Sequence, residues 1–221
     1  VRVNSQLLIG THGWDHTHWS GAFYDPELPP EWRLTFYANL LRAVLVPEST
    51  GVKLNAALAS AWFEDTDVGF RFVVEVSVGL AKQVSDDPAS LQRWLEGIGF
   101  LGGRVVAVLL RTSARDAHLT TVVLDRFCDA VSPLPVCVGP SDPPDGQEDC
   151  GAVWYPSRQA AQTVGHYLVV LSDTGDPAEL RRLIEWFIAQ DLEGAALFMT
   201  DRRRGFEHAQ QARLVAEMLG V

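Results

Sequence analysis

Short runs of apolar residues alternate along this chain with segments in which apolar residues recur at helical spacing. The runs have the length of roughly four to eight residues that is typical of buried strands. We interpret them as strands at residues 7–10, 43–46, 70–76, 105–111, 136–139, 152–154, 167–172 and 195–200. Because helical segments separate most of these strands, the pattern predicts an α/β fold, a (β/α)8 TIM-barrel-like domain. A doubly wound open sheet is the alternative.

The segments between the strands carry the signals that begin and support helices. Asp87 and Asp176 are each followed by proline, a combination that favours a helix start. Helices are also predicted at residues 53–63, 116–131 and 206–219. An early helix opens at Pro29-Pro30. We expect its buried stripe to comprise Trp32, Phe36, Tyr37, Leu40 and Leu41.

The whole chain, residues 1–221, is predicted to form a single domain. Its length suits one packed core, and no internal repeat or linker divides it. The turn-rich segment 140–151 lies between the fifth and sixth predicted strands. We therefore expect a reduced or irregular barrel wall at this point.

Composition narrows the functions open to such a domain. The formal net charge is −10, and an acidic surface is repelled by nucleic acids and by anionic membranes. No apolar run approaches the roughly 18 residues of a membrane span, and the first residues lack a signal-peptide core. The cysteines Cys128, Cys137 and Cys150 form no CxxC pair. We therefore expect no disulfide framework and a cytoplasmic location.

Two motifs near the start of the chain carry a family resemblance. The sequence IGTHGW stands at 9–14 and WSGAFY at 19–24, followed by Asp25-Pro26 and Leu28-Pro29. This pattern resembles the YecE-like family, domain of unknown function number seventy-two, which has G-T-S-G-W, then W-x-G-x-F-Y-P and L-P. Further similar positions are Ser49-Thr50, Trp62 and residues 69–72. The resemblance implies a TIM-barrel-like fold and no established activity.

The chain also departs from the family pattern. Val46 and Glu48 stand where the family has E-x-N, and Glu75 replaces a lysine at the end of the third strand. Gly139 replaces a glutamate, and residues 167–172 replace the charged Y-V-R-L-H-G run. We therefore expect apolar or small residues in place of charged groups at the mouth of the barrel. Such losses indicate a diverged, non-catalytic member.

The loop after the first predicted strand is rich in histidine. His12, His16 and His18 lie close in sequence to Asp15. Imidazole is a good ligand for zinc or iron, so this loop is the candidate site for a divalent metal. The alternative is a packed aromatic loop with exposed histidines. Trp14, together with Trp19 and Trp154, is a candidate for lining a ligand cavity.

The loop after the last predicted strand supplies the candidate anion site. It contains Arg202, Arg203 and Arg204, and TIM barrels often bind phosphate at the loops after strands seven and eight. Arg111, at the end of the fourth strand, is expected to face the same cavity, and arginine binds such anions through paired contacts. The alternative is a solvated turn. Its arginines would then pair with Asp173, Asp201 or Glu207.

For acid–base chemistry, Glu48 and Glu75 are the candidate catalytic residues. They end the second and third strands, and joint burial would raise the pKa of one of them. The alternative is that Glu75 points outward, or that each carboxylate pairs with an arginine.

Three functions remain open from the sequence. The first is a non-catalytic barrel that binds a small anionic ligand or a protein partner. The second is a metal-dependent hydrolase or isomerase acting on a phosphorylated or sugar-like substrate, which rests on fold analogy. The third, a nucleic-acid-processing protein, conflicts with the acidic charge. Beyond the candidate divalent metal, no cofactor is indicated.

Overall fold

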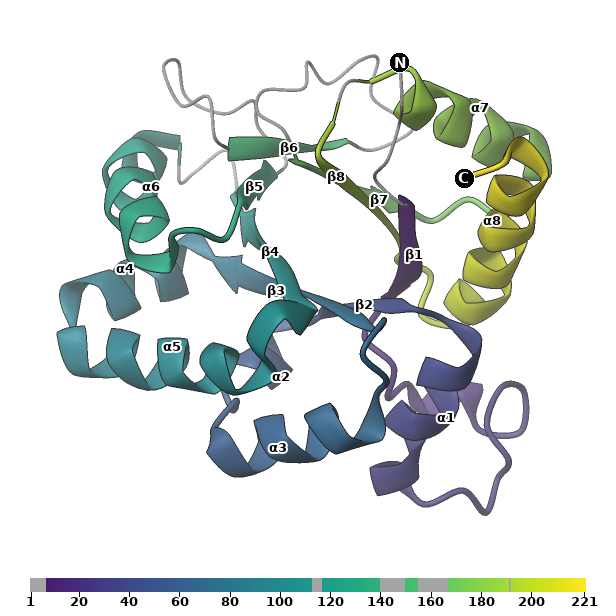
Figure 1. The fold of residues 1–221 in the computed structure, drawn as a ribbon, viewed down its shortest axis with the longest axis horizontal. Coiled ribbons are helices and arrows are strands. Elements are labelled where there is room, and N and C mark those ends of the chain that lie inside the picture. Colours follow the sequence, from purple (N-terminus) through teal and green to yellow (C-terminus); the bar gives the residue numbers. More distant parts are fainter. Residues whose placement is uncertain (1–6, 113–116, 140–149, 155–166, 191) are drawn as a thin grey trace.

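Eight parallel strands form a closed barrel with helices around it (Figure 1). The computed structural model describes residues 7–112, 117–139, 150–154, 167–190 and 192–221, with the backbone alone at 84, 85, 117–122 and 150–154. The strands are β1 (Leu7–His12), β2 (Ala43–Val46), β3 (Arg71–Ser77), β4 (Val105–Arg111), β5 (Val136–Gly139), β6 (Cys150–Trp154), β7 (Tyr167–Ser172) and β8 (Gly194–Met199). Each strand pairs with the next, and β1 pairs with β8.

This topology confirms the predicted (β/α)8 barrel and excludes the open sheet. The bounds of β2, β4, β5 and β7 are those expected from the sequence, and the other strands differ at one or both ends by one or two residues. β6 pairs with both β5 and β7, so the barrel wall is continuous where a reduced or irregular region was expected. Residues 140–149 themselves lie outside the described residues.

In the strands whose side chains the structure describes, alternate side chains enter two different cores, because successive residues of a strand point to opposite faces. The outward side chains pack against the helices. The inward side chains form a separate core, made of Ala43, Leu45, Val73, Ala107, Leu109, Cys137, Val169, Leu171, Ala196 and Phe198. The barrel is therefore filled below its mouth, and only residues at the carboxyl ends of the strands can meet a ligand.

A bulge sets the orientation of the later part of β4. The β3–β4 register shifts after Phe72, opposite the extra residue Val106. Such a bulge places two residues of one strand against one of its partner. Beyond it the pairing is regular up to Ser77 and Arg111 at the carboxyl end. Arg111 therefore lies on the inner side of β4, two residues after Leu109.

Most of the helices connect successive strands. They are α1 (Arg33–Leu40), α2 (Glu48–Gly51), α3 (Ala56–Asp65), α4 (Val78–Asp86), α5 (Pro88–Leu101), α6 (Ala117–Val131), α7 (Pro177–Ile188) and α8 (Gly205–Leu219). Single 3-10 turns occur at Thr17–Trp19, Pro30–Trp32 and Gly102–Arg104. In the part of the chain that the structure describes, no helix is long and apolar enough to span a membrane.

The residues at the starts of the helices explain why some helix boundaries predicted from the sequence are wrong. The helix predicted at 53–63 begins only at Ala56, because Asn55 is its cap and accepts a hydrogen bond from the Leu58 amide. α2 and α4 were not predicted. Ser77 both ends β3 and caps α4 through its hydroxyl, so no polar loop marks this boundary in the sequence.

The buried face of α1 also differs from the predicted stripe. The helix buries Leu34, Tyr37 and Ala38. Trp32 is 64% exposed and Phe36 is 36% exposed. The prediction assumed one helix from the prolines onward, whereas a 3-10 turn precedes α1. Its tighter winding moves Trp32 out of the stripe.

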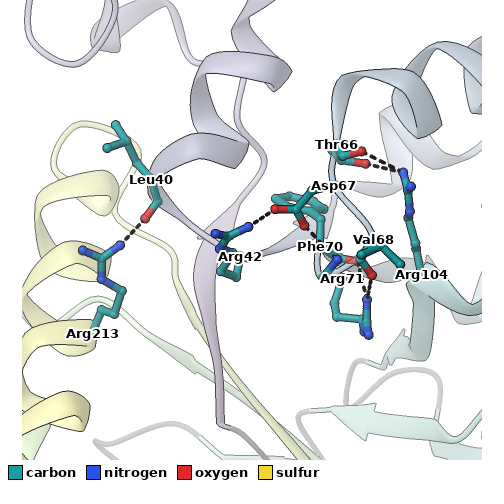
Figure 2. Close-up of polar contacts among 10 residues, drawn as sticks. Leu40, Arg42, Thr66, Asp67, Val68, Phe70, Arg71, Arg104 and Arg213 are labelled. Atoms are coloured by element: carbon teal, nitrogen blue, oxygen red, sulfur yellow. Dashed lines mark hydrogen bonds and ion pairs between the residues drawn. The ribbon is translucent and has the colours of Figure 1, made fainter.

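A buried arginine ties loops together at the amino-terminal face of the barrel (Figure 2). Arg104 is 9% exposed. Its guanidinium donates to the carbonyl oxygens of Phe63 and Thr66 and to the Thr66 hydroxyl, at 2.5 to 3.1 Å. It also lies 3.6 Å from the centre of the Phe63 ring. This arginine satisfies carbonyls of the last turn and the C-cap of α3, which the helix leaves unpaired.

Two further arginines act at the same face. Arg213 of α8 donates to the carbonyl oxygen of Leu40, at the end of α1, and Arg42 pairs with the exposed Asp67 (Figure 2). These contacts lie at the end of the barrel away from the carboxyl ends of the strands. We assign them to stability, as is usual for this face of a TIM barrel.

Candidate functional site

A cleft opens beside the carboxyl ends of β1 and β2, at the end of the barrel where TIM-barrel active sites lie. Its volume is about 630 Å³, which is in the range of small-molecule sites. Its walls are the loop after β1, the start of α1, parts of α2 and α3, and the loop after β8. The polar and aromatic side chains that line it are His12, Trp14, Asp15, His16, Thr17, His18, Glu31, Ser49, Thr50, Trp62, Asp65 and Arg202.

Hydrogen bonds fix the loop that follows β1. Gly13 has a φ of 78°, a conformation that glycine adopts readily, and it turns the chain out of the strand. Nε2 of His16 donates to the carbonyl oxygen of His12 at 2.8 Å. The Tyr24 hydroxyl donates to the carbonyl oxygen of Trp14 at 2.5 Å. The loop therefore forms a defined wall of the cleft.

Of the three tryptophans considered from the sequence, Trp14 lines the cleft. Its ring meets that of Trp62 edge to face, with 5.0 Å between centroids. Trp19 is fully buried and packs against the His16 ring, so it supports the loop from beneath. The side chain of Trp154 lies outside the described residues.

An ion-pair network occupies the mouth of the barrel. Nε2 of His12 lies 2.6 Å from Oε2 of Glu75, and Nε of Arg111 lies 3.5 Å from Oε1 of the same carboxylate. His12 is the last residue of β1, and Arg111 is the last residue of β4. Glu75 lies near the carboxyl end of β3, on its inner side, and its side chain is 13% exposed. The expectation of apolar or small residues in place of charged groups is therefore wrong for this part of the mouth.

The pKa of Glu75 also differs from the expectation of a raised value. Burial alone would raise it. The hydrogen bond and the electrostatic interaction with His12, together with the positive charge of Arg111, outweigh burial, and the Glu48 amide adds to them. The pKa of Glu75 is therefore below its ordinary value, and the group is a carboxylate at neutral pH.

Glu48 was expected at the end of the second strand, but it lies at the start of a helix. It begins α2, and its Oε2 accepts a hydrogen bond from the backbone amide of Ser77. The carboxylate thus links α2 to the end of β3. Glu48 and Glu75 are neighbours in space, but each is held by its own donors.

The three histidines of the loop have different surroundings. His12 is paired with Glu75, His16 donates to a carbonyl group, and His18 is exposed. Burial lowers the pKa of His16, and the nearby positive charges of His12 and Arg202 lower it further, against the effect of its hydrogen bond. Within the described ranges, no group of three or more His, Cys, Asp or Glu side chains is placed to hold a metal ion.

The three consecutive arginines after β8 have different surroundings. Arg202 lines the cleft. Arg202 and Arg203 are both exposed, and Nε of Arg204 lies 2.8 Å from the carboxylate of Glu207. The Asp201 carboxylate accepts from the amides of Arg203 and Arg204, and these bonds lower the pKa of Asp201.

Arg111 is not part of the cleft lining and is held by Glu75. The arginines that the sequence predicted to bind one anion together therefore lie in separate environments. Sequence reasoning found His12, Glu75 and Arg111 one by one, for three different purposes, but missed that they form one network. The alternation of inward and outward residues along β1, β3 and β4 is the signal that could have joined them.

Comparison with known proteins places the chain in a family. The family model described as "Protein of unknown function DUF72" matches residues 8–142, more than half of the sequence. The chain belongs to the DUF72 family. DUF72 and the YecE-like family are the same, so the resemblance carried by residues 9–14 and 19–24 is confirmed.

Solved DUF72 proteins share this barrel. A DUF72 family protein from Thermotoga maritima is 16% identical, with a TM-score of 0.72 over 98% of this chain and 100% of its own. One from Enterococcus faecalis is 13% identical, with a TM-score of 0.71 over all of both chains. D-psicose 3-epimerase is 9% identical, with a TM-score of 0.55 over 97% of each chain. At these identities the likeness concerns the fold alone. Curated proteins give no match.

Proposed function

We propose that this DUF72 protein binds a small hydroxylated anion, such as a sugar phosphate, in the cleft between the loops after β1 and β8. The observation that carries the proposal is the position of Arg202. Its side chain lines the cleft, and among the residues that the structure describes it forms no ion pair with a carboxylate. A guanidinium in that position is available for paired hydrogen bonds to an anionic group.

The other charges of the cleft give the ligand an orientation. Asp15 is paired with Arg33, which reduces its repulsion of an anion. Glu31 and Asp65 come from the side of α1 and α3, whereas Arg202 comes from the loop after β8. A ligand with its anionic group at Arg202 would present hydroxyl groups to these two carboxylates, which only accept hydrogen bonds.

Fold analogy adds weak support for a sugar-like ligand. D-psicose 3-epimerase, which has a similar barrel, was crystallised in the presence of D-fructose. The metal-dependent alternative would need a ligand set, and the described side chains do not bring one together. A cytoplasmic location remains the prediction from the cysteine pattern.

The test compares two neighbouring arginines. Calorimetric titration with glucose 6-phosphate should show binding to the wild-type protein and a loss of affinity of about tenfold or more in Arg202→Ala, because a charged hydrogen bond is lost. Arg203→Ala removes the same charge from the same turn outside the cleft, and its affinity should stay within about twofold. Glucose is the neutral control. Equal affinities of the two variants, or equally tight binding of glucose, would overturn the proposal.

A further inference from the structure

His12 connects the barrel interior to the cleft. Its side chain lines the cleft, while its Nε2 atom lies 2.6 Å from the buried carboxylate of Glu75. The pair therefore has one member that a bound molecule can touch and one member that is largely shielded from water.

The charge of Glu75 decides which ring nitrogen of His12 carries the proton. An ionised carboxylate only accepts hydrogen bonds, so Nε2 of His12 is the donor. In the neutral imidazole the other nitrogen, Nδ1, then keeps its lone pair. Among the described residues no hydrogen bond to Nδ1 of His12 competes for that lone pair.

The carboxylate is itself held in place. Arg111 contacts Oε1, the oxygen that His12 does not use, and the backbone amide of Glu48 helps to keep the pKa of this carboxyl group low. A carboxylate restrained in this way fixes both the tautomer and the direction of the imidazole ring. A histidine held in one tautomer is prepared to accept a proton.

We propose that His12 is a general base, oriented by Glu75, and that the cleft catalyses proton transfer on a small hydroxy-carbonyl anion. This inference rests on the binding function proposed above and adds a reaction to it.

The step needs no co-reactant. Nδ1 of His12 takes the proton from the carbon next to the carbonyl group of the ligand. The C–H electron pair becomes the second bond between the two carbons, and the carbonyl π electrons move to oxygen, which gives an enolate. Glu75 stabilises the imidazolium that forms, and Arg202 balances the anionic group of the ligand. Return of the proton to carbon restores the carbonyl group, and in D2O a deuteron is returned in its place.

The tautomer of His12 can be measured without a ligand. 15N NMR of the free protein should show neutral His12 protonated at Nε2 and unprotonated at Nδ1. In Glu75→Gln, which keeps the shape and removes the charge, the two tautomers should become mixed. Wild-type His12 protonated at Nδ1 would overturn the proposal, because the nitrogen that has to accept the proton of the ligand would then be a donor.

The reaction is tested with dihydroxyacetone phosphate in D2O. Proton NMR should show exchange of the hydrogens next to the carbonyl group, loss of exchange in His12→Gln, and exchange slower by about 10²–10⁴-fold in Glu75→Gln. The affinity of Glu75→Gln for the same probe should stay within about threefold. Exchange of equal rate in His12→Gln would overturn the proposal, since the proton transfer would then not depend on His12.

The experiments distinguish failure of the proposed binding function from failure of the proposed reaction. A wild-type protein that binds the probe without exchanging its hydrogens overturns the base and leaves the binding function intact. A wild-type protein that binds neither glucose 6-phosphate nor dihydroxyacetone phosphate overturns the binding function, and the reaction with it.

Discussion

The indole Nε1 of Trp19 donates a hydrogen bond to the backbone carbonyl of Arg202, at 3.0 Å. The two residues are 183 positions apart in the chain and belong to the loops after β1 and β8. Since Trp19 is fully buried, this bond fixes the backbone of Arg202 against the loop that forms the opposite wall of the cleft. The position of the candidate anion-binding group is therefore set by the first loop of the barrel.

Trp19→Phe removes the donor and keeps an aromatic ring. We expect a loss of unfolding free energy of about 1 kcal/mol or more, because the carbonyl of Arg202 loses its partner and the smaller ring leaves space. The affinity for glucose 6-phosphate should fall several-fold as Arg202 becomes less restrained. Trp32→Phe, at a position that is 64% exposed, is the control and should change neither quantity. Urea unfolding and calorimetry measure the two effects, and unchanged affinity in Trp19→Phe would contradict the role given to this bond.

The arginines of the amino-terminal face should differ in their contribution to stability. Arg104→Ala leaves the partly buried carbonyl oxygen of Phe63 and the buried one of Thr66 without this partner, and we expect a loss of about 2–3 kcal/mol. Arg42→Ala breaks an exposed ion pair and should cost less than about 1 kcal/mol. Urea unfolding at neutral pH compares them. Losses of the same size would show that the burial of Arg104 does not matter.

Glu75 should make the stability of the protein depend on pH on the acid side. Its folded pKa lies below the value of about 4.3 expected in the unfolded chain, so the unfolded state takes up the proton first as pH falls. Its contribution is complete above roughly pH 5. It is lost as the pH falls toward and through the lowered folded pKa.

The matched variant for this effect is Glu75→Gln, which cannot titrate. The difference in unfolding free energy between wild type and variant should be largest near neutral pH and should shrink as the solution is acidified. Urea unfolding at a series of pH values measures it. A difference that stays constant down to about pH 3 would mean that the carboxylate is not stabilised by His12 and Arg111.

Close approach of β1 and β2 requires glycine at position 10. A Cβ added to Gly10 would lie 1.9 Å from the carbonyl oxygen of Ala43, so Gly10→Ala must push the strands apart. We expect a loss of about 3 kcal/mol or failure to fold. Gly103→Ala meets no atom within 4 Å and should stay within about 0.5 kcal/mol of wild type. Thermal unfolding of the pair checks this, and similar midpoints would be inconsistent with the steric argument.

The barrel could be predicted because a buried parallel strand has a continuous run of apolar residues in its sequence. Residues 43–46, 105–111, 136–139 and 167–172 are such runs, and their bounds agree with the structure. The short helix α2 and the helix α4 escaped prediction because their starts follow strand ends without a polar loop. The stripe of α1 failed for a geometric reason, since one 3-10 turn before the helix changes the face on which Trp32 lies.

The candidate site was predictable residue by residue but not as an arrangement. The sequence places His12, Glu75 and Arg111 at strand ends, where a TIM barrel holds its functional groups. Their contact depends on barrel closure and on strand register, which bring residues 63 positions apart within 2.6 Å. Conversely, Arg202, Arg203 and Arg204 are adjacent in sequence, but Arg202 lines the cleft and Arg204 pairs with Glu207.

The extra residue in β4 determines where this strand can lose a residue. Val106 occupies the bulge, and the pairs on either side of it would form a regular ladder without it. Deletion of this residue could therefore be absorbed locally, while a deletion closer to the mouth would turn Arg111 from the inner to the outer face. Loss of Val106 would thus leave the contact between Arg111 and the Glu75 carboxylate in place. The bulge thus lies at the start of β4, apart from the five regular pairs that lead to Arg111.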